Sequence, residues 1–278
     1  MFSPDVVQQM KRREALAQTR KANALNKRKV AQKQSKSSDK LGILVLSPRT
    51  ETNLNNTTIP IESKYREKKV ETWNLLQGGA VELVHNFLPQ ETADELFEQC
   101  KYPNTSPNLN WQQEVIRIFG RKVIAPRYTG FVGENANLTY SYSNTTKTAV
   151  EWSPLVQQVT NGIEEYCNQK FNVALLNWYE TGQNYIGWHS DSEKDMPPGS
   201  KIASVSLGMT RPFQFQYQKD ISVPILEMDL KHGDLLIMGG TVQKFYKHSL
   251  PKLPRSKPSS PRLNFTFRLV AHRNDSPK

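Results

Sequence analysis

The chain has 278 residues and a formal net charge of +11 at pH 7, which suits one catalytic domain of about 200 residues with an appendage. Two cysteines, Cys100 and Cys167, exclude a disulfide scaffold and a cysteine-rich zinc site, and they indicate a reducing compartment. No apolar run approaches the roughly 20 residues of a membrane span, and the N-terminus lacks the apolar segment of a secretion signal.

The positive charge is concentrated near the N-terminus. Residues 1–40 contain eleven Lys and Arg against three acidic residues. The block "NKRKVAQKQSK" is typical of a nuclear-localisation signal or a nucleic-acid-binding arm, although a solvated tail without a partner would look the same. We predict a disordered basic arm and linker over residues 1–65 and a folded domain over residues 66–273.

The first elements of the domain read as a strand, a helix, a strand pair and a second helix. "AVELVHNFLP" predicts a strand over residues 80–89, and "QETADELFEQC" predicts an amphipathic helix over residues 90–100. "EVIRIFGRKVIAP" predicts two strands around a turn at Gly120. The next helix should start at Ser153 as N-cap, with Pro154 in its first turn and an apolar face formed by Leu155, Val159, Ile163 and Tyr166.

After residue 172 the pattern changes to short strands separated by Gly- and Pro-bearing turns. We predict strands over residues 173–179, 201–208, 212–217, 225–230, 234–239 and 262–270. Short strands at this spacing favour a sandwich or a barrel. The fold class is therefore mainly β with flanking helices.

The last strand, "RLNFTFRLV", alternates apolar and polar residues. Leu263, Phe265, Phe267 and Leu269 share one face, and Arg262, Asn264, Thr266 and Arg268 share the other. A half-exposed strand with its polar face in water would show this alternation. In a closed barrel the polar face would instead line a ligand cavity, where Arg is suited to grip a carboxylate bidentately.

The segment "YIGWHSDSEKD" places His189 and Asp191 two residues apart, so an extended chain would point both to one face. A surface His beside a loop Asp is the simplest reading of an isolated HxD. Together with a later His248, however, the pattern HxD…H matches the facial triad of non-haem Fe(II) enzymes. A zinc hydrolase could use the same three residues but has no need for the paired arginines.

From about residue 80 to 270 the sequence resembles the AlkB family of Fe(II)- and 2-oxoglutarate-dependent alkylation-repair dioxygenases. The matching segments, in family order, are "LNWYETGQNYIGWHSDSE", "IASVSLG", "HGDLLIM", "KHSLPK" and "PRLNFTFR". HxD alone is a weak signal. HxD followed by a His 57 residues after the Asp, and then by RxNxTxR starting 14 residues later, is a strong one.

The resemblance implies a double-stranded β-helix, or jelly roll, and assigns the cofactor residues. The implied iron ligands are His189, Asp191 and His248. Arg262 and Arg268 would bind the two carboxylates of 2-oxoglutarate, and O₂ is the second cosubstrate. The residues that would assist them are Asn177, Tyr179 and Thr266.

The resemblance also suggests substrate contacts. "NLTYSYS" resembles the family's substrate lid, which places Tyr140 and Tyr142 against a flipped base, although cross-strand packing is an alternative. Phe119 would fill the gap that a flipped base leaves in a duplex, unless it is a core residue before a turn. Glu193 matches an acidic position near the substrate, whereas Ser192 departs from the second Asp of close relatives.

The predicted function is oxidative removal of N-methyl groups, of the 1-methyladenine and 3-methylcytosine type, from DNA, with RNA as an alternative carrier. The product is formaldehyde, and no membrane is involved. The enzyme is expected to be a monomer in the nucleus, with the cytoplasm as a second location. A dioxygenase acting on protein or a small molecule, or a catalytically silent nucleic-acid-binding module, remains as an alternative. We expect His85, His232 and His272 to be structural or surface residues.

Overall fold

The computed structural model describes residues 68–102, 109–118, 121–142, 145–191 and 195–271. Outside these ranges lie the predicted arm and its boundary with the domain, and five residues singled out above, namely Phe119, Gly120, Ser192, Glu193 and His272. Among the described residues, no helix combines the length and the apolar composition that a membrane crossing requires.

The larger of two main sheets has nine strands and is antiparallel except where the short β7 pairs with β4. Its spatial order is β1 (Val70–Asn74), β2 (Gly79–Val84), β13 (Leu235–Gly240), β10 (Ile202–Gly208), β15 (Arg262–Arg268), β8 (Val173–Tyr179), β4 (Arg121–Gly133) and β3 (Gln112–Ile118), with β7 (Val150–Glu151) beside β4.

Within the described ranges, a smaller antiparallel sheet and a separate hairpin complete the β structure. The smaller sheet has the order β12 (Leu226–Leu230), β11 (Arg211–Tyr217), β14 (Tyr246–Leu250) and β9 (Ile186–His189). The hairpin consists of β5 (Thr139–Tyr142) and β6 (Thr145–Thr148). Two antiparallel sheets in this arrangement confirm the predicted jelly roll.

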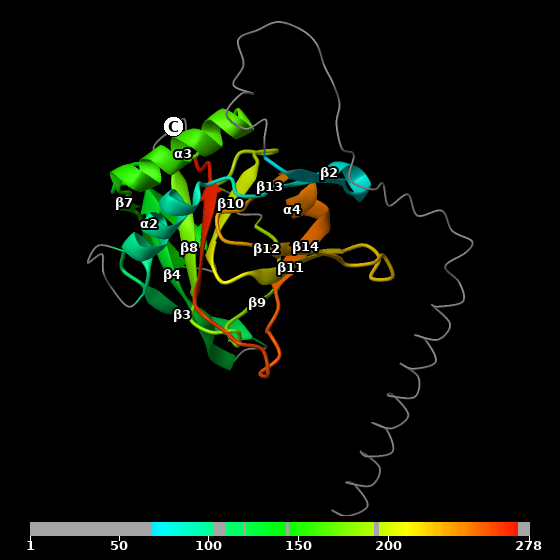
Figure 1. Ribbon diagram of the computed structural model, residues 1–278. Helices are drawn as coiled ribbons and strands as arrows, with labels where there is room; N and C mark the ends of the chain where they lie inside the picture. Colours follow the sequence, from blue (N-terminus) through cyan, green and yellow to red (C-terminus); the bar gives the residue numbers. More distant parts are fainter. Residues whose placement is uncertain (1–67, 103–108, 119–120, 143–144, 192–194, 272–278) are drawn as a thin grey trace, which may run out of the picture. The chain divides into compact units, whose positions relative to one another are not determined.

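The helices are few, and the two long ones cover the larger sheet. Figure 1 shows α2 (Gln90–Cys100) and α3 (Pro154–Cys167) along the outer side of that sheet. The one-turn α4 (Val242–Phe245) contacts β2, β13 and β14, and the 3₁₀ turn η2 (Leu76–Gly78) connects β1 to β2. The α3 helix begins as predicted, since the Ser153 hydroxyl accepts the N–H of Val156 at 3.3 Å.

Packing under α3 differs in detail from the predicted apolar face. Val159 and Ile163 are buried as expected, and Val156 and Cys167 join them in the core. Leu155 and Tyr166 are only partly buried against this core, at its edge. The helical period was correct, but the centre of the buried stripe is rotated toward residues 156 and 167.

Strand β15 resolves the ambiguity of its alternating pattern, because all seven of its residues are buried. Its apolar face packs in the core through Leu263, Phe265 and Phe267, and the polar side chains of the opposite face are at most 7% exposed, so neither face of β15 reaches solvent. The polar face therefore lines an interior cavity, and the reading of a half-exposed strand is wrong.

Candidate active site

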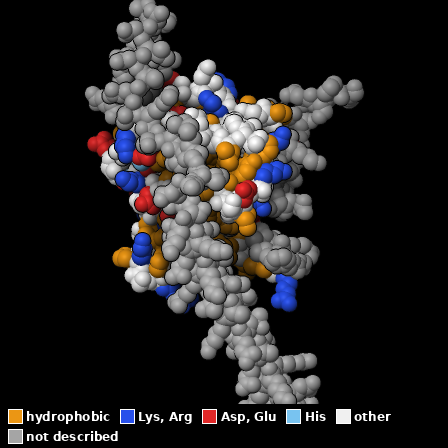
Figure 2. Space-filling view, turned by 90° about the vertical axis from the view of Figure 1, so that its right-hand side faces the viewer, with side chains coloured by type: hydrophobic (Ala, Val, Ile, Leu, Met, Phe, Trp, Pro, Cys, Tyr) orange, Lys and Arg blue, Asp and Glu red, His pale blue; other side chains and the backbone are white. Residues whose placement is uncertain are grey.

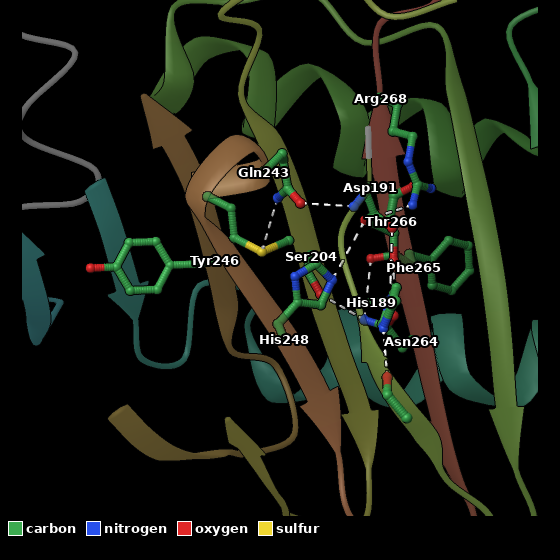
Figure 3. A network of polar contacts seen from close by, with 12 residues as sticks. His189, Asp191, Ser204, Gln243, Tyr246, His248, Asn264, Phe265, Thr266 and Arg268 are labelled. Atoms are coloured by element: carbon green, nitrogen blue, oxygen red, sulfur yellow. Dashed lines mark hydrogen bonds and ion pairs between the residues drawn. The ribbon is translucent and has the colours of Figure 1, made fainter. Parts of the chain in front are cut away.

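Pairing of β9 with β14 in the smaller sheet brings the residues of the predicted triad together at the end of β9. His189 ends β9 and pairs directly with His248 of β14, so that their rings lie 4.3 Å apart between centroids. The third member, Asp191, lies just beyond the end of β9. The His189 Nε2 to Asp191 Oδ1 distance is 3.7 Å, and the His248 Nε2 to Asp191 Oδ2 distance is 3.9 Å (Figure 3).

These separations are too long for hydrogen bonds and suit three atoms that share one ion. One ligand atom from each of the three residues lies within 4.8 Å of the other two. Two imidazoles and one carboxylate on one side of an ion leave positions open for further ligands, as in the facial triad of non-haem Fe(II) enzymes.

The protonation states of the three residues favour metal binding at neutral pH. Burial alone would raise the pKa of Asp191, but Arg268, through its charge and its hydrogen bond, acts together with His248 and His189 to outweigh burial and lower that pKa to about 2. The Arg268 Nη2 lies 2.8 Å from Asp191 Oδ2. Burial lowers the pKa of His248 to about 3 and also lowers the pKa of His189. An ionised carboxylate and neutral imidazoles are the forms that bind a metal.

A backbone carbonyl fixes the orientation of one imidazole. The His189 Nδ1 lies 2.8 Å from the Gly187 carbonyl oxygen. A carbonyl can only accept a hydrogen bond, so Nδ1 carries the proton and donates it. The lone pair of Nε2 is thereby directed toward Asp191 and His248, in the arrangement that metal-binding histidines commonly show.

The cavity beside the triad gathers all of the predicted iron and 2-oxoglutarate residues except Arg262. Its lining includes Asn177, Tyr179, His189, Asp191, His248, Thr266 and Arg268. Sequence reasoning did not single out Arg127 and Ser204, which also line it. Ser204 could have been found, since "IASVSLG" alternates small polar and apolar residues as "RLNFTFR" does.

Arg262 is not among the lining residues but contacts one of them, Tyr179, and it carries a charge that no described carboxylate offsets. Its side chain is only 2% exposed, it stands 5.4 Å from the Tyr179 ring, and its Nη2 donates to the Ser206 hydroxyl at 2.9 Å. The Nε has no hydrogen-bond partner among the described residues. Burial lowers the pKa of Arg262 to about 10, so it is still charged at neutral pH. A buried cation of this kind fits an anionic ligand such as a carboxylate.

A chain of hydrogen bonds holds the polar side chains of the cavity. Arg127 donates from Nε to Asn177 Oδ1 at 2.8 Å. The Thr266 hydroxyl donates to Asn264 Oδ1 at 2.9 Å, and Asn264 Nδ2 donates to the Ser204 hydroxyl at 2.8 Å (Figure 3). These side chains are therefore pre-organised before any ligand enters.

Two other histidines lie outside the cavity and have polar partners of their own. His85 lies 3.3 Å from Asp234 and 3.1 Å from Glu71, between β1 and the turn before β13. His232 accepts the Gly208 backbone N–H at Nδ1, at 2.8 Å. Neither belongs to the cluster of possible metal ligands found among the described residues.

The predicted substrate residues stay predictions. The backbone of Tyr140 and Tyr142 forms β5, which pairs with β6. Phe119 and Glu193 lie outside the described ranges.

The backbone of Asp191 is held by Gln243, a residue that sequence reasoning missed. The Asp191 N–H donates to the Gln243 Oε1 at 2.8 Å from the single turn of α4 (Figure 3). His189 and His248 are fixed by the β9–β14 ladder, whereas Asp191 lies beyond the last ladder pair. The amide of Gln243 thus takes the place of a strand partner.

We expect Gln243→Met, which keeps the length but removes the acceptor, to raise the Kd for Mn(II) about 10- to 100-fold, as other changes behind metal ligands do. Mn(II) replaces Fe(II) because it resists oxidation during titration calorimetry. Gln243→Glu retains an oxygen acceptor and should bind Mn(II) nearly as the unaltered protein does. Equal dissociation constants for all three proteins would contradict this role.

Comparisons with known proteins agree with this geometry. The sequence model of the 2OG-Fe(II) oxygenase superfamily matches residues 80–268. The human protein "DNA oxidative demethylase ALKBH2" is 35% identical over 184 residues, which cover 64% of this chain and 69% of that protein. The Arabidopsis thaliana protein of the same name is 31% identical over 224 residues, covering 72% of this chain and 69% of that protein.

A second relative supports the same family, and a solved structure supports the fold. The human protein "Alpha-ketoglutarate-dependent dioxygenase alkB homolog 3" is 35% identical over 202 residues, covering 68% of this chain and 65% of that protein. A solved structure described as "The structure of OsALKBH1" aligns with a TM-score of 0.53 at 18% identity, over 68% of this chain and 97% of that one, and supports the fold alone. The chain spans about two thirds of the length of the curated relatives named here. It belongs to the AlkB family within the 2OG-Fe(II) oxygenase superfamily, and it is an Fe(II)- and 2-oxoglutarate-dependent dioxygenase.

Proposed function

We propose that this protein removes N-methyl groups from bases of the 1-methyladenine and 3-methylcytosine type in DNA and releases formaldehyde. The observation that carries the proposal is the intact triad, together with a buried, unbalanced Arg262 next to the cavity-lining Tyr179, in a chain similar to proteins named DNA oxidative demethylase. Together, bound Fe(II) and 2-oxoglutarate supply the activation of O₂ that oxidises the N-methyl group.

The residues of the chain bind and orient the reactants. We assign iron binding to His189, Asp191 and His248, whose unprotonated donor atoms face one another. Arg262 neutralises one carboxylate of 2-oxoglutarate, and Arg268, which lines the cavity beside Asp191, takes the other. Asn177, Tyr179 and Thr266 complete the polar wall of the cavity.

The surface of the β3–β4 hairpin supports a nucleic-acid substrate. Val115 and Ile124 pair directly across the hairpin and are 58% and 62% exposed, which is unusual for large apolar side chains. The neighbouring Arg121 and Lys122 are also exposed. Apolar side chains beside cations fit a partner that offers both base faces and phosphates.

A second basic segment lies at the same end of the molecule. Lys252, Arg255 and Lys257 are exposed in the loop between β14 and β15, and both this loop and the β3–β4 hairpin are at the lower end of Figure 1. By contrast, Figure 2 shows a face on which acidic and basic side chains are interspersed with apolar ones. A phosphate backbone is therefore better matched at the lower end.

The N-terminal arm extends the proposal to localisation and affinity. Its basic block would serve as a nuclear-localisation signal and would add salt-dependent, sequence-independent attraction to DNA. The folded domain over residues 66–273 would act as a monomer.

A formaldehyde-release assay tests the proposal. Equal amounts of single-stranded DNA, duplex DNA, RNA and a peptide, each carrying N-methyl groups, are incubated with the protein, Fe(II), 2-oxoglutarate and O₂. We expect formaldehyde and succinate in equal amounts from methylated DNA. Release from RNA alone would move the substrate to RNA, and release from the peptide alone would overturn the nucleic-acid assignment.

Phe119 should matter for duplex DNA only. Flipping a base costs a few kcal/mol of stacking and pairing, and a side chain that fills the gap recovers part of it. We expect Phe119→Ala to cut activity on methylated duplex DNA at least about tenfold, which is about 1.4 kcal/mol of barrier. Activity on a methylated single strand should stay within about twofold. Equal losses on both substrates, together with a lowered melting temperature, would instead make Phe119 a core residue.

A further inference from the structure

Three polar side chains from three strands meet beside the β5–β6 hairpin. The Lys147 Nζ of β6 lies 2.7 Å from the Glu114 Oε1 of β3 and donates to the Thr129 hydroxyl of β4 at 2.6 Å. The Thr129 hydroxyl in turn donates to Glu114 Oε1 at 3.1 Å. This Lys147–Thr129–Glu114 triangle links the hairpin to the larger sheet.

The triangle is buried, so its Lys and Glu side chains do not form an ordinary solvent-exposed ion pair. The Lys147 and Glu114 side chains are 13% and 9% exposed, and Thr129 is fully buried. The Glu114 Oε2 has no hydrogen-bond partner among the described residues. Removing two charges from water costs about as much as their attraction returns, so the pair adds little net stability, whereas loss of one partner leaves the other as an uncompensated buried charge.

The position of Lys147 in the sequence is equally specific. It is the one charged residue in residues 135–150, "NANLTYSYSNTTKTAV". In the register of β5 and β6 it stands opposite Tyr140. A single ammonium group thus holds an otherwise uncharged hairpin.

The attachment point lies next to the active-site cavity. Thr129 pairs across β4 and β8 with Asn177, which lines that cavity. Arg127, two residues before Thr129 on the same face of β4, also lines the cavity and donates to Asn177. The hairpin is therefore fastened to a residue that stands directly opposite a cavity-lining residue, Asn177.

We propose that the Lys147–Thr129–Glu114 triangle positions the β5–β6 hairpin at the rim of the active-site cavity, where the hairpin meets the methylated base. The three residues are positioning residues, because they act through the hairpin. The inference rests on the proposed function for the identity of the substrate, but not for the anchoring of the hairpin itself.

The first experiment measures the anchoring without any substrate. Hydrogen exchange of the backbone amides is compared between the unaltered protein and Lys147→Met, Glu114→Gln and the exposed-site control Lys231→Met. We expect faster exchange over residues 139–148 in the first two variants, with β8 unchanged, and no change in the control. Unchanged exchange in Lys147→Met would overturn the proposal.

The second experiment measures the consequence for substrate binding. With a methylated oligonucleotide, we expect Lys147→Met and Glu114→Gln to raise the KM about tenfold each, a coupling of the size found between contacting residues. The KM for 2-oxoglutarate should stay within about twofold, because its proposed residues are not part of the triangle. Parallel rises in both KM values with a lowered melting temperature would reduce the triangle to a structural contact.

Exchange of the two charges provides the rescue. A hydroxyl can accept from an ammonium and donate to a carboxylate at once, so Thr129 can serve the pair in either orientation. Glu114→Lys combined with Lys147→Glu should restore the oligonucleotide KM to within about threefold, and failure to rescue in a folded double variant would contradict the ion-pair mechanism. An unaltered protein that is inactive on every methylated nucleic acid would overturn the proposed function, while the exchange data would still decide whether the triangle holds the hairpin.

Discussion

Replacing Asp191 with alanine is expected to abolish succinate formation and demethylation, leaving less than about one thousandth of the activity, a loss of about 4 kcal/mol or more in transition-state stabilisation. The carboxylate is the one anionic ligand among the three residues of the triad. It also neutralises the positive charge of Arg268, whose Nη2 lies 2.8 Å from Asp191 Oδ2. The variant therefore loses a ligand and leaves a buried cation without its carboxylate.

Stability must be separated from chemistry in this test. Removing one partner of a buried pair costs about 3–5 kcal/mol, so Asp191→Ala is compared with Asp191→Asn, which keeps the shape and an oxygen acceptor. Both variants, and His189→Ala and His248→Ala, should bind Mn(II) weakly while circular dichroism shows a folded domain. Near-normal turnover of Asp191→Asn at matched iron occupancy would remove Asp191 from the metal site.

The triad was predictable from sequence because its signals are few and ordered. HxD and the later His stand at the end of one strand and inside another, and the β9–β14 pairing brings His189 opposite His248. The extended-chain argument for His189 and Asp191 is only partly right, since Asp191 lies beyond β9. The position of Asp191 is instead set by Gln243 and Arg268.

Some contacts of the site could not be predicted from the sequence, because they join segments that are far apart in the chain and show no motif or periodic pattern. Nothing in "TTKT" indicates that Lys147 would meet Glu114, because the pairing depends on how β6 lies against β3. Gln243 belongs to a helix of four residues, too short to leave a periodic signal. The alternation of β15 was visible, but only the folded structure, in which the side chains of the polar face are buried and, except for Arg262, line the cavity, shows that this face is interior.

Arg262→Met is expected to raise the Kd for 2-oxoglutarate at least about a hundredfold, measured by calorimetry with Mn(II) in place of Fe(II). Each hydrogen bond to a charged group contributes about 1.5–3 kcal/mol, and a guanidinium can offer two to one carboxylate. Arg262 is 2% exposed and has no ion pair among the described residues, so the ligand would supply its missing counter-charge. Loss of that interaction cannot be replaced by the thioether of Met.

The same substitution should leave the ligand-free protein as stable as before or more stable. Replacing an unbalanced buried charge with an apolar side chain of similar volume is often neutral or stabilising by about 1–4 kcal/mol. Arg211 provides the matched control, because it is equally buried but donates to backbone carbonyls, among them Asn184 at 3.0 Å and Pro251 at 2.6 Å. Arg211→Met should therefore lower the melting temperature of the ligand-free protein, whereas Arg262→Met should not.

Addition of 2-oxoglutarate should raise the melting temperature of the unaltered protein and not that of Arg262→Met. A lowered melting temperature in Arg262→Met with unchanged 2-oxoglutarate affinity would show that Arg262 supports the fold and does not bind the cosubstrate.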